Sequence, residues 1–140
     1  MISITRDPID VCKVLQDAKD RSAGGTTLFI GTVRDHNDMG TVSEIYYEAY
    51  KEMAEDTLAK IESEVFKRWR IKKFIAIHRI GNLNVGDISV AVCVSSEHRS
   101  EAFEACKYGI DRIKTVVPIW KKEISESGAT WVEGVSSTGD

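Results

Sequence analysis

The segment Lys114-Thr115-Val116-Val117-Pro118-Ile119-Trp120-Lys121-Lys122-Glu123 sets a proline inside a short apolar run that lysines flank. Pro118 cannot continue a helix, because it lacks an N–H and its ring collides with the preceding turn. The residue before a proline also favours extended geometry. We therefore expect Lys114 to close a helix and Lys121 to lie on the extended segment that follows. Cations from two different elements would then converge on one anionic ligand.

The rest of the chain alternates helical and strand-like patterns. Apolar residues spaced three or four apart predict a long helix over 51–69 and a second over 100–115, the latter with Ser100 as N-cap and Phe103 in its buried stripe. The remaining elements that the sequence predicts are a short helix over 9–21, strands over 26–33, 42–50, 73–79 and 88–95, and a hairpin of 119–124 with 130–133. This order indicates an α+β domain with helices packed on one side of a mainly antiparallel sheet. We expect one domain over 1–135 and a disordered tail over 136–140.

Composition excludes several classes of protein. The 140 residues carry a net charge of −3, which gives no support for nonspecific binding to nucleic acid. Three widely spaced cysteines without a CxxC pair argue against a disulfide framework or a zinc site. No apolar run is long enough to span a membrane, and the first residues lack the layout of a signal peptide. We therefore expect a cytoplasmic protein without a metal site.

Each lysine of the opening segment also has a structural interpretation. A lysine in the last turn of a helix, such as Lys114, can simply complement the helix dipole. Lys121 and Lys122 should point to opposite faces of a strand, so that one can face a cleft while the other faces solvent or a partner. Lone strand lysines are usually solvated.

Further candidates lie where strands end. His98 and Arg99 precede the second long helix, whose N-terminus is a ready site for anions, although a polar turn explains them equally well. Arg34 follows a strand and can bind an anion through two hydrogen bonds. Asp35 and His36 resemble an acid–base pair, but no motif marks a nucleophile beside them. Together the basic residues indicate an anionic small-molecule ligand.

Six separated motifs occur in the same order as in the large, catalytic subunit of molybdopterin synthase. They cover residues from about 5 to 134, and they read Gly31-Thr32-Val33-Arg34-Asp35-His36-Asn37, Tyr47-Glu48-Ala49-Tyr50, Ile77-His78-Arg79-Ile80-Gly81, Ser95-Ser96-Glu97-His98-Arg99-Ser100-Glu101-Ala102-Phe103, Lys114 to Glu123 as quoted above, and Trp131-Val132-Glu133. The chain thus resembles that family along nearly its whole length.

The resemblance implies an α/β hammerhead fold and a homodimer, which becomes a heterotetramer when each copy binds a small ubiquitin-like sulfur-carrier subunit. The carrier's C-terminal Gly-Gly tail bears a thiocarboxylate and enters the active site. The substrate is cyclic pyranopterin monophosphate and the product is molybdopterin with its dithiolene, a step of molybdenum cofactor biosynthesis. No cofactor, nucleic acid or membrane is implied.

By the same resemblance, Lys114 and Lys121 match the catalytic lysines of the family. The positions that match its substrate-binding residues are Thr32, Val33, Arg34, His98, Arg99, Lys122 and Glu123. A thiocarboxylate and a cyclic phosphate are both anionic, so bringing them together in a partly desolvated pocket requires cations.

Two positions depart from the family pattern. Thr32 stands where many relatives carry lysine, and Val135 follows the last motif where some relatives place an arginine that reaches the neighbouring subunit. The alternative to an enzyme is a noncatalytic dimeric module that binds an anion or a peptide tail. In that case Lys114 and Lys121 would affect affinity but not turnover.

Overall fold

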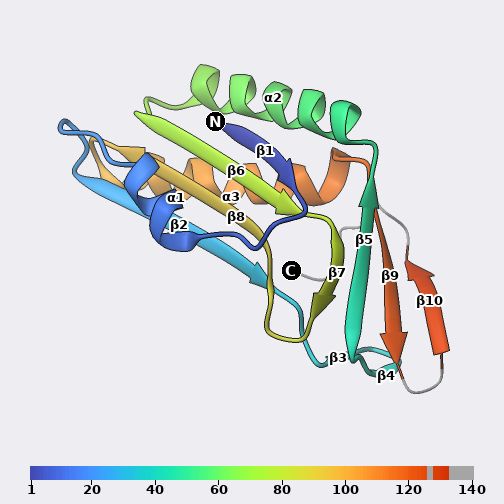
Figure 1. The fold of residues 1–140 in the computed structure, drawn as a ribbon. Coiled ribbons are helices and arrows are strands. Elements are labelled where there is room, and N and C mark those ends of the chain that lie inside the picture. Colours follow the sequence, from blue (N-terminus) through green and yellow to red (C-terminus); the bar gives the residue numbers. More distant parts are fainter. Residues whose placement is uncertain (126–127, 133–140) are drawn as a thin grey trace.

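The computed structural model describes residues 1–125 and 128–132, which form three helices and ten strands in two four-stranded sheets and a small hairpin (Figure 1). The helices are α1 (Val11–Asp17), α2 (Lys51–Arg68) and α3 (Arg99–Val116). The strands are β1 (Ile2–Thr5), β2 (Gly25–Thr32), β3 (His36–Asn37), β4 (Gly40–Thr41), β5 (Glu44–Ala49), β6 (Lys73–Arg79), β7 (Gly81–Asn84), β8 (Ile88–Ser96), β9 (Ile119–Ser125) and β10 (Gly128–Val132). The expected tail over 136–140 lies outside the described residues, and the domain boundary at residue 135 stays a prediction.

The α+β class is confirmed, but the strands form two main sheets where one was expected. The first sheet has the order β1-β6-β8-β2 and the second the order β10-β9-β5-β7. The chain passes between the sheets several times, and the shortest passage, from β6 to β7, leads into Gly81, whose φ of +96° favours glycine. All pairings within these sheets are antiparallel except that of β1 with β6.

The two long helices cover one face of the first sheet. In α2 the buried side chains recur every three or four residues, at Ala54, Leu58, Ile61 and Val65. They pack in one core with side chains of the first sheet that include Phe74. Burying each of the larger apolar side chains contributes roughly 1.5–3 kcal/mol.

The short helix α1 lies on the opposite face of the first sheet, in front of it in Figure 1, so the prediction that helices lie on one side holds for α2 and α3 only. Val14 and Ala18 pack there against Ile75 and Cys93. Successive strand residues point to opposite faces, and both faces of these central strands are apolar and require a cover.

The start of α3 differs from its prediction. The N-cap is His98, not Ser100, and Arg99 is the first helical residue. The buried stripe begins at Ala102, whereas Phe103 is 61% exposed. The far end agrees with the sequence, because α3 stops at Val116, Val117 is extended, and β9 begins directly after Pro118.

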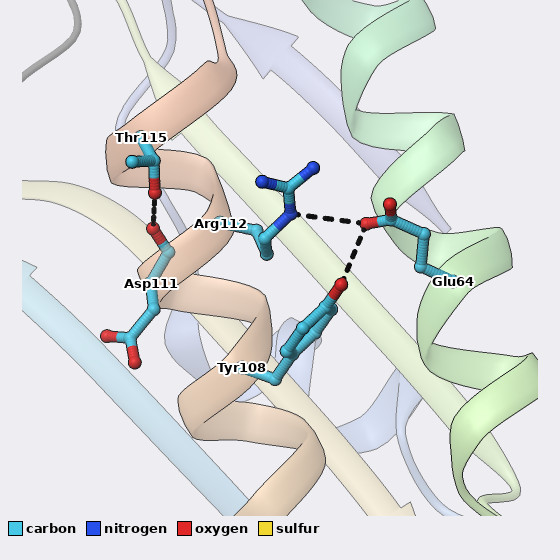
Figure 2. Close-up of polar contacts among 5 residues, drawn as sticks. All are labelled: Glu64, Tyr108, Asp111, Arg112 and Thr115. Atoms are coloured by element: carbon cyan, nitrogen blue, oxygen red, sulfur yellow. Dashed lines mark hydrogen bonds and ion pairs between the residues drawn. The ribbon is translucent and has the colours of Figure 1, made fainter.

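Polar contacts link α3 to α2 beside the buried stripe of α3. In Figure 2 the Oε1 atom of Glu64 accepts hydrogen bonds from Tyr108 Oη, at 3.1 Å, and from Arg112 Nε, at 3.3 Å. Thr115 Oγ1 donates to the carbonyl of Asp111 and closes the last turn. Lys114 lies two residues after Arg112, about 200° around the helix, so it points away from α2.

Candidate active site

A pocket opens where the hairpin, β5 and β9 meet. Its polar lining comprises Thr32, Arg34, His36, Tyr47, Lys121 and Glu123, with Val42 and Ile45 as apolar members. The charge pattern of the sequence predicted Arg34 and Lys121, the family resemblance added Thr32 and Glu123, and the fold brings the four together from separate segments. A small anion entering this pocket would meet both a guanidinium and an ammonium group.

Strand geometry positions Lys121 and Glu123. They are two residues apart on β9 and therefore share a face, and their neighbours on β5 are Tyr47 and Ile45. The Nζ atom of Lys121 lies 3.3 Å from Oε1 of Glu123, and only 21% and 11% of these side chains are exposed. The ion pair holds the ammonium inside the pocket wall.

The hairpin of β3 and β4 supports the same carboxylate. Asn37 Nδ2 donates a hydrogen bond to Oε2 of Glu123, so each oxygen of that carboxylate has a partner. Asp38 and Met39 form the tight turn between the two short strands, and Gly40, which begins β4 directly after it, has a φ of +130° that favours glycine. The sequence predicted only a polar loop here, and Asn37 was not among the expected site residues.

The turn after β2 places Thr32 and Val33 differently. Thr32 is exposed and lines the pocket, whereas the side chain of Val33 is 4% exposed and packs in the core. The backbone N–H of Val33 donates to the carbonyl of Asp87, and its own carbonyl accepts from Gly86. Val33 therefore anchors the strand end from which Arg34 extends.

Lys122 lies on the face of β9 away from Lys121, as the period of a strand requires. Its Nζ atom is 5.5 Å from the ring centroid of Trp131, which is its cross-strand neighbour on β10. This lysine does not line the pocket.

Asp35 and His36 form an exposed pair at the pocket, of which only His36 belongs to the lining. Nδ1 of His36 lies 2.7 Å from Oδ1 of Asp35, and this hydrogen bond lowers the pKa of the Asp35 carboxyl below its ordinary value. No serine or cysteine is among the residues that line the pocket.

Lys114 lies in the last turn of α3 and is not among the residues that line this pocket, but its charge acts on His78, a residue that the sequence indicated to be structural. His78 is buried, and its ring meets that of Tyr47 edge to face, with 5.1 Å between centroids. Burial, and then the charge of Lys114, lower the pKa of His78 to about 4. Tyr47 thus joins the pocket of Lys121 to the neighbourhood of Lys114.

His98 and Arg99 do not join this cluster within one chain. They stand exposed at the opposite end of α3 from Lys114, fifteen residues and about 22 Å away along the helix axis. His98 contributes to a separate cavity with Trp69, Arg70 and Lys72.

Neither a metal centre nor a membrane segment is found in the described part of the chain. Among residues 1–125 and 128–132, no three His, Cys, Asp or Glu side chains gather closely enough to hold a metal ion. No helix within those ranges is long and apolar enough to cross a membrane.

The model of the MoaE protein family matches residues 4–116, which include every element from β1 to α3 except the first two residues of β1. The chain belongs to the MoaE family. Its relatives include the molybdopterin synthase catalytic subunit of Bacillus subtilis, 43% identical over 92% of this chain and 82% of that protein. The human molybdopterin synthase catalytic subunit is 39% identical over 94% of this chain and 70% of its own length.

Solved structures of the MoaE family share the fold. The crystal structure of molybdopterin synthase from Staphylococcus aureus matches with a TM-score of 0.89 and 39% identity, over 93% of this chain and 95% of that one. A MoaE protein from Burkholderia ambifaria matches with a TM-score of 0.84 and 34% identity, over 98% and 91% of the two chains. The family suggested by the six motifs is therefore confirmed.

Proposed function

We propose that this chain catalyses sulfur transfer in the cytoplasm as the large subunit of a molybdopterin synthase. The sulfur comes from the C-terminal thiocarboxylate of a small ubiquitin-like carrier, and the acceptor is cyclic pyranopterin monophosphate. The observation that carries the proposal is the convergence of Arg34 and Lys121 in one pocket, whose lining residue Tyr47 contacts His78, the ring on which the charge of Lys114 acts. Family membership supplies the reaction.

The charges of the pocket suit the reactants. Arg34 offers a planar, bidentate donor for the phosphate, and Lys121 offers an ammonium group. In this proposal Lys114 positions the thiocarboxylate and stabilises the oxyanion that develops on the tail's carbonyl. Lys121 donates and accepts protons during ring opening and sulfur addition, while Glu123 keeps it in place.

Each transfer breaks one carbon–sulfur bond of the tail, and a water oxygen must take the place of the lost sulfur. A dithiolene contains two sulfur atoms. Two carriers that each bear a thiocarboxylate must therefore bind at the site one after the other, and the tail that has lost its sulfur must dissociate in between.

The distance between the two ends of α3 supports a role for a second copy. We assign His98 and Arg99 to the substrate's phosphate and polar edge, but they lie about 22 Å from Lys114 in one chain. Strand β2 is at the edge of its sheet; Gly25 pairs with Ser96 near His98, and Thr32 at its other end lines the pocket. A copy paired antiparallel along β2 would bring its own His98 end toward this pocket.

Mixed dimers test the shared site. A Lys121→Ala chain combined with a chain carrying both His98→Ala and Arg99→Ala should regain activity, because one of the two sites in each mixed dimer would be intact. No gain over either parent, with mixed dimers present, would place all these residues in a single chain's site.

The reaction itself is tested by mixing the protein with cyclic pyranopterin monophosphate and a thiocarboxylated carrier, and then assaying molybdopterin. Product that requires the thiocarboxylate supports the proposal. Tight binding of the carrier without product would instead favour the noncatalytic binding module, with Thr32 in place of lysine as the first position to restore.

A further inference from the structure

Asn37, a half-buried residue of β3, connects the hairpin of β3 and β4 to the pocket. Its Nδ2 atom donates a hydrogen bond to Oε2 of Glu123, which lies 86 residues later in the chain. The other oxygen of that carboxylate, Oε1, lies 3.3 Å from Nζ of Lys121. Asn37 does not itself line the pocket, whereas the two charged residues do. An amide, a carboxylate and an ammonium group thus form a chain of contacts that ends inside the pocket.

A second hydrogen bond fixes the orientation of the Asn37 amide. Its Oδ1 atom accepts from the backbone N–H of Met39 at 2.8 Å. A backbone N–H can only donate, and a carboxylate can only accept, so the amide oxygen must face the turn and the amide nitrogen must face Glu123. Asparagine meets both demands with one short side chain. Aspartate would keep the bond to the turn but would lack the donor for Glu123.

The hairpin is held beside β9 by contacts that do not involve this amide. Directly after the hairpin, Ser43 donates to the carbonyl of Ile124 on β9, from its backbone N–H at 2.8 Å and from Oγ at 3.0 Å. The backbone N–H of Val42 donates to the carbonyl of Asp35 at 2.8 Å and closes the base of the hairpin. The position of the hairpin therefore does not depend on the Asn37 side chain, whose effect falls on the carboxylate that it contacts.

We propose that Asn37 is a positioning residue for Lys121, with its amide holding the Glu123 carboxylate in the orientation that directs the ammonium into the pocket. The role rests on the proposed sulfur transfer, since Asn37 acts through Glu123 and does not touch the reactants. Only 11% of the Glu123 side chain is exposed, so water is a poor substitute for the amide donor. Without that donor the carboxylate is free to turn about its last bond, and the ammonium loses its fixed neighbour.

Exchanging the two side-chain types tests this hydrogen bond. Asn37→Asp keeps the bond to Met39 but sets two carboxylates against each other, and Glu123→Gln sets a donor against either the Asn37 amide or the Lys121 ammonium. In the double variant the new amide at position 123 can donate to the new carboxylate at position 37, while its oxygen still accepts from Lys121. We expect kcat to fall about tenfold in each single variant and to rise at least about threefold above both in the double variant, with KM changed by less than about twofold throughout.

Met39→Ala is the control, because this side chain is 92% exposed in the same turn and its backbone N–H is retained. It should leave kcat unchanged. Full kcat in Asn37→Asp would overturn the proposal, because the donor to Glu123 would then be dispensable. A double variant no more active than the better single variant would overturn it as well.

The contact is also testable if the unaltered protein makes no molybdopterin, in which case the proposed function fails. Asn37→Ala removes the amide without adding a charge. In this variant the NMR signals of the Lys121 side chain next to its ammonium should shift, whereas those of Lys122, on the opposite face of β9, should not. Unshifted Lys121 signals would refute the positioning role.

Discussion

Replacing Gly109 with alanine should destabilise the protein, although alanine is the better helix former. A Cβ atom at this position of α3 would lie 2.9 and 3.2 Å from Cε2 and Cζ of Phe74, and 3.4 Å from Cγ1 of Val92. Phe74 is 2% exposed and packed on all sides, so its ring cannot move away without disturbing its neighbours. Overpacking costs about 1–3 kcal/mol, and the higher helix propensity of alanine offsets up to about 1 kcal/mol of it. We expect a net loss of about 1–2 kcal/mol.

Urea unfolding followed by circular dichroism measures this loss as a change in the free energy of unfolding. Lys107→Ala, at an exposed position two residues earlier on α3, is the matched control and should change stability by less than about 0.5 kcal/mol. Phe74→Leu replaces the ring with a smaller side chain, so the double variant Gly109→Ala, Phe74→Leu should lose less free energy of unfolding than the sum of the two single variants. A Gly109→Ala protein as stable as the unaltered one, or more stable, would refute the close packing of α3 on the sheet.

Three other predictions concern the ionisable groups. Glu123→Ala removes the partner of Lys121 and should lower kcat about tenfold. Because the pair is largely buried, the free energy of unfolding should also fall, by about 1–3 kcal/mol; unchanged kcat would show that the ammonium needs no support. For His78 the folded pKa of about 4 lies below the ordinary 6.5, so the unfolded chain binds its proton first as pH falls. Protonation of His78 therefore lowers the free energy of unfolding by up to about 3 kcal/mol as pH falls from 6.5 to 4. His78→Gln should make the free energy of unfolding depend less on pH in that range, and the same pH dependence in both proteins would contradict the prediction. Finally, a thiol reagent should modify only Cys12 in the native protein and all three cysteines in urea, because burial raises the pKa of Cys93 and Cys106 to about 11. Rapid modification of all three cysteines in the native protein would contradict the fold.

Local patterns in the sequence were sufficient to predict the long helices. The apolar spacing of α2 and the proline after α3 are properties of neighbouring residues, and both helices end within a few residues of the predicted positions. Strands β1 and β7 were missed because each has only four residues and exists through its pairing with a distant segment. The ammonium of Met1, for example, donates to the carbonyl of Phe74 at 2.7 Å and extends the pairing of β1 with β6. No pattern within Ile2–Thr5 encodes that partner.

The sequence allowed the charged residues of the site to be predicted, but not which of them lie close together in the fold. The period of a strand separates Lys121 from Lys122 without any structure. That Asn37 reaches Glu123 depends on a hairpin folded against β9, and the burial of His78 depends on how β5 packs against the first sheet. The separation of His98 from Lys114 follows from the length of α3, which converts fifteen residues into about 22 Å.

The most direct test of the proposed mechanism is the single-turnover rate of molybdopterin formation in Lys114→Ala and Lys121→Ala, measured with saturating thiocarboxylated carrier alongside the affinity for that carrier. We predict that both variants bind the carrier within about threefold of the unaltered protein and form product at least about a hundredfold more slowly. Product formed at the unaltered rate by either variant would contradict the assignment of that lysine to sulfur transfer.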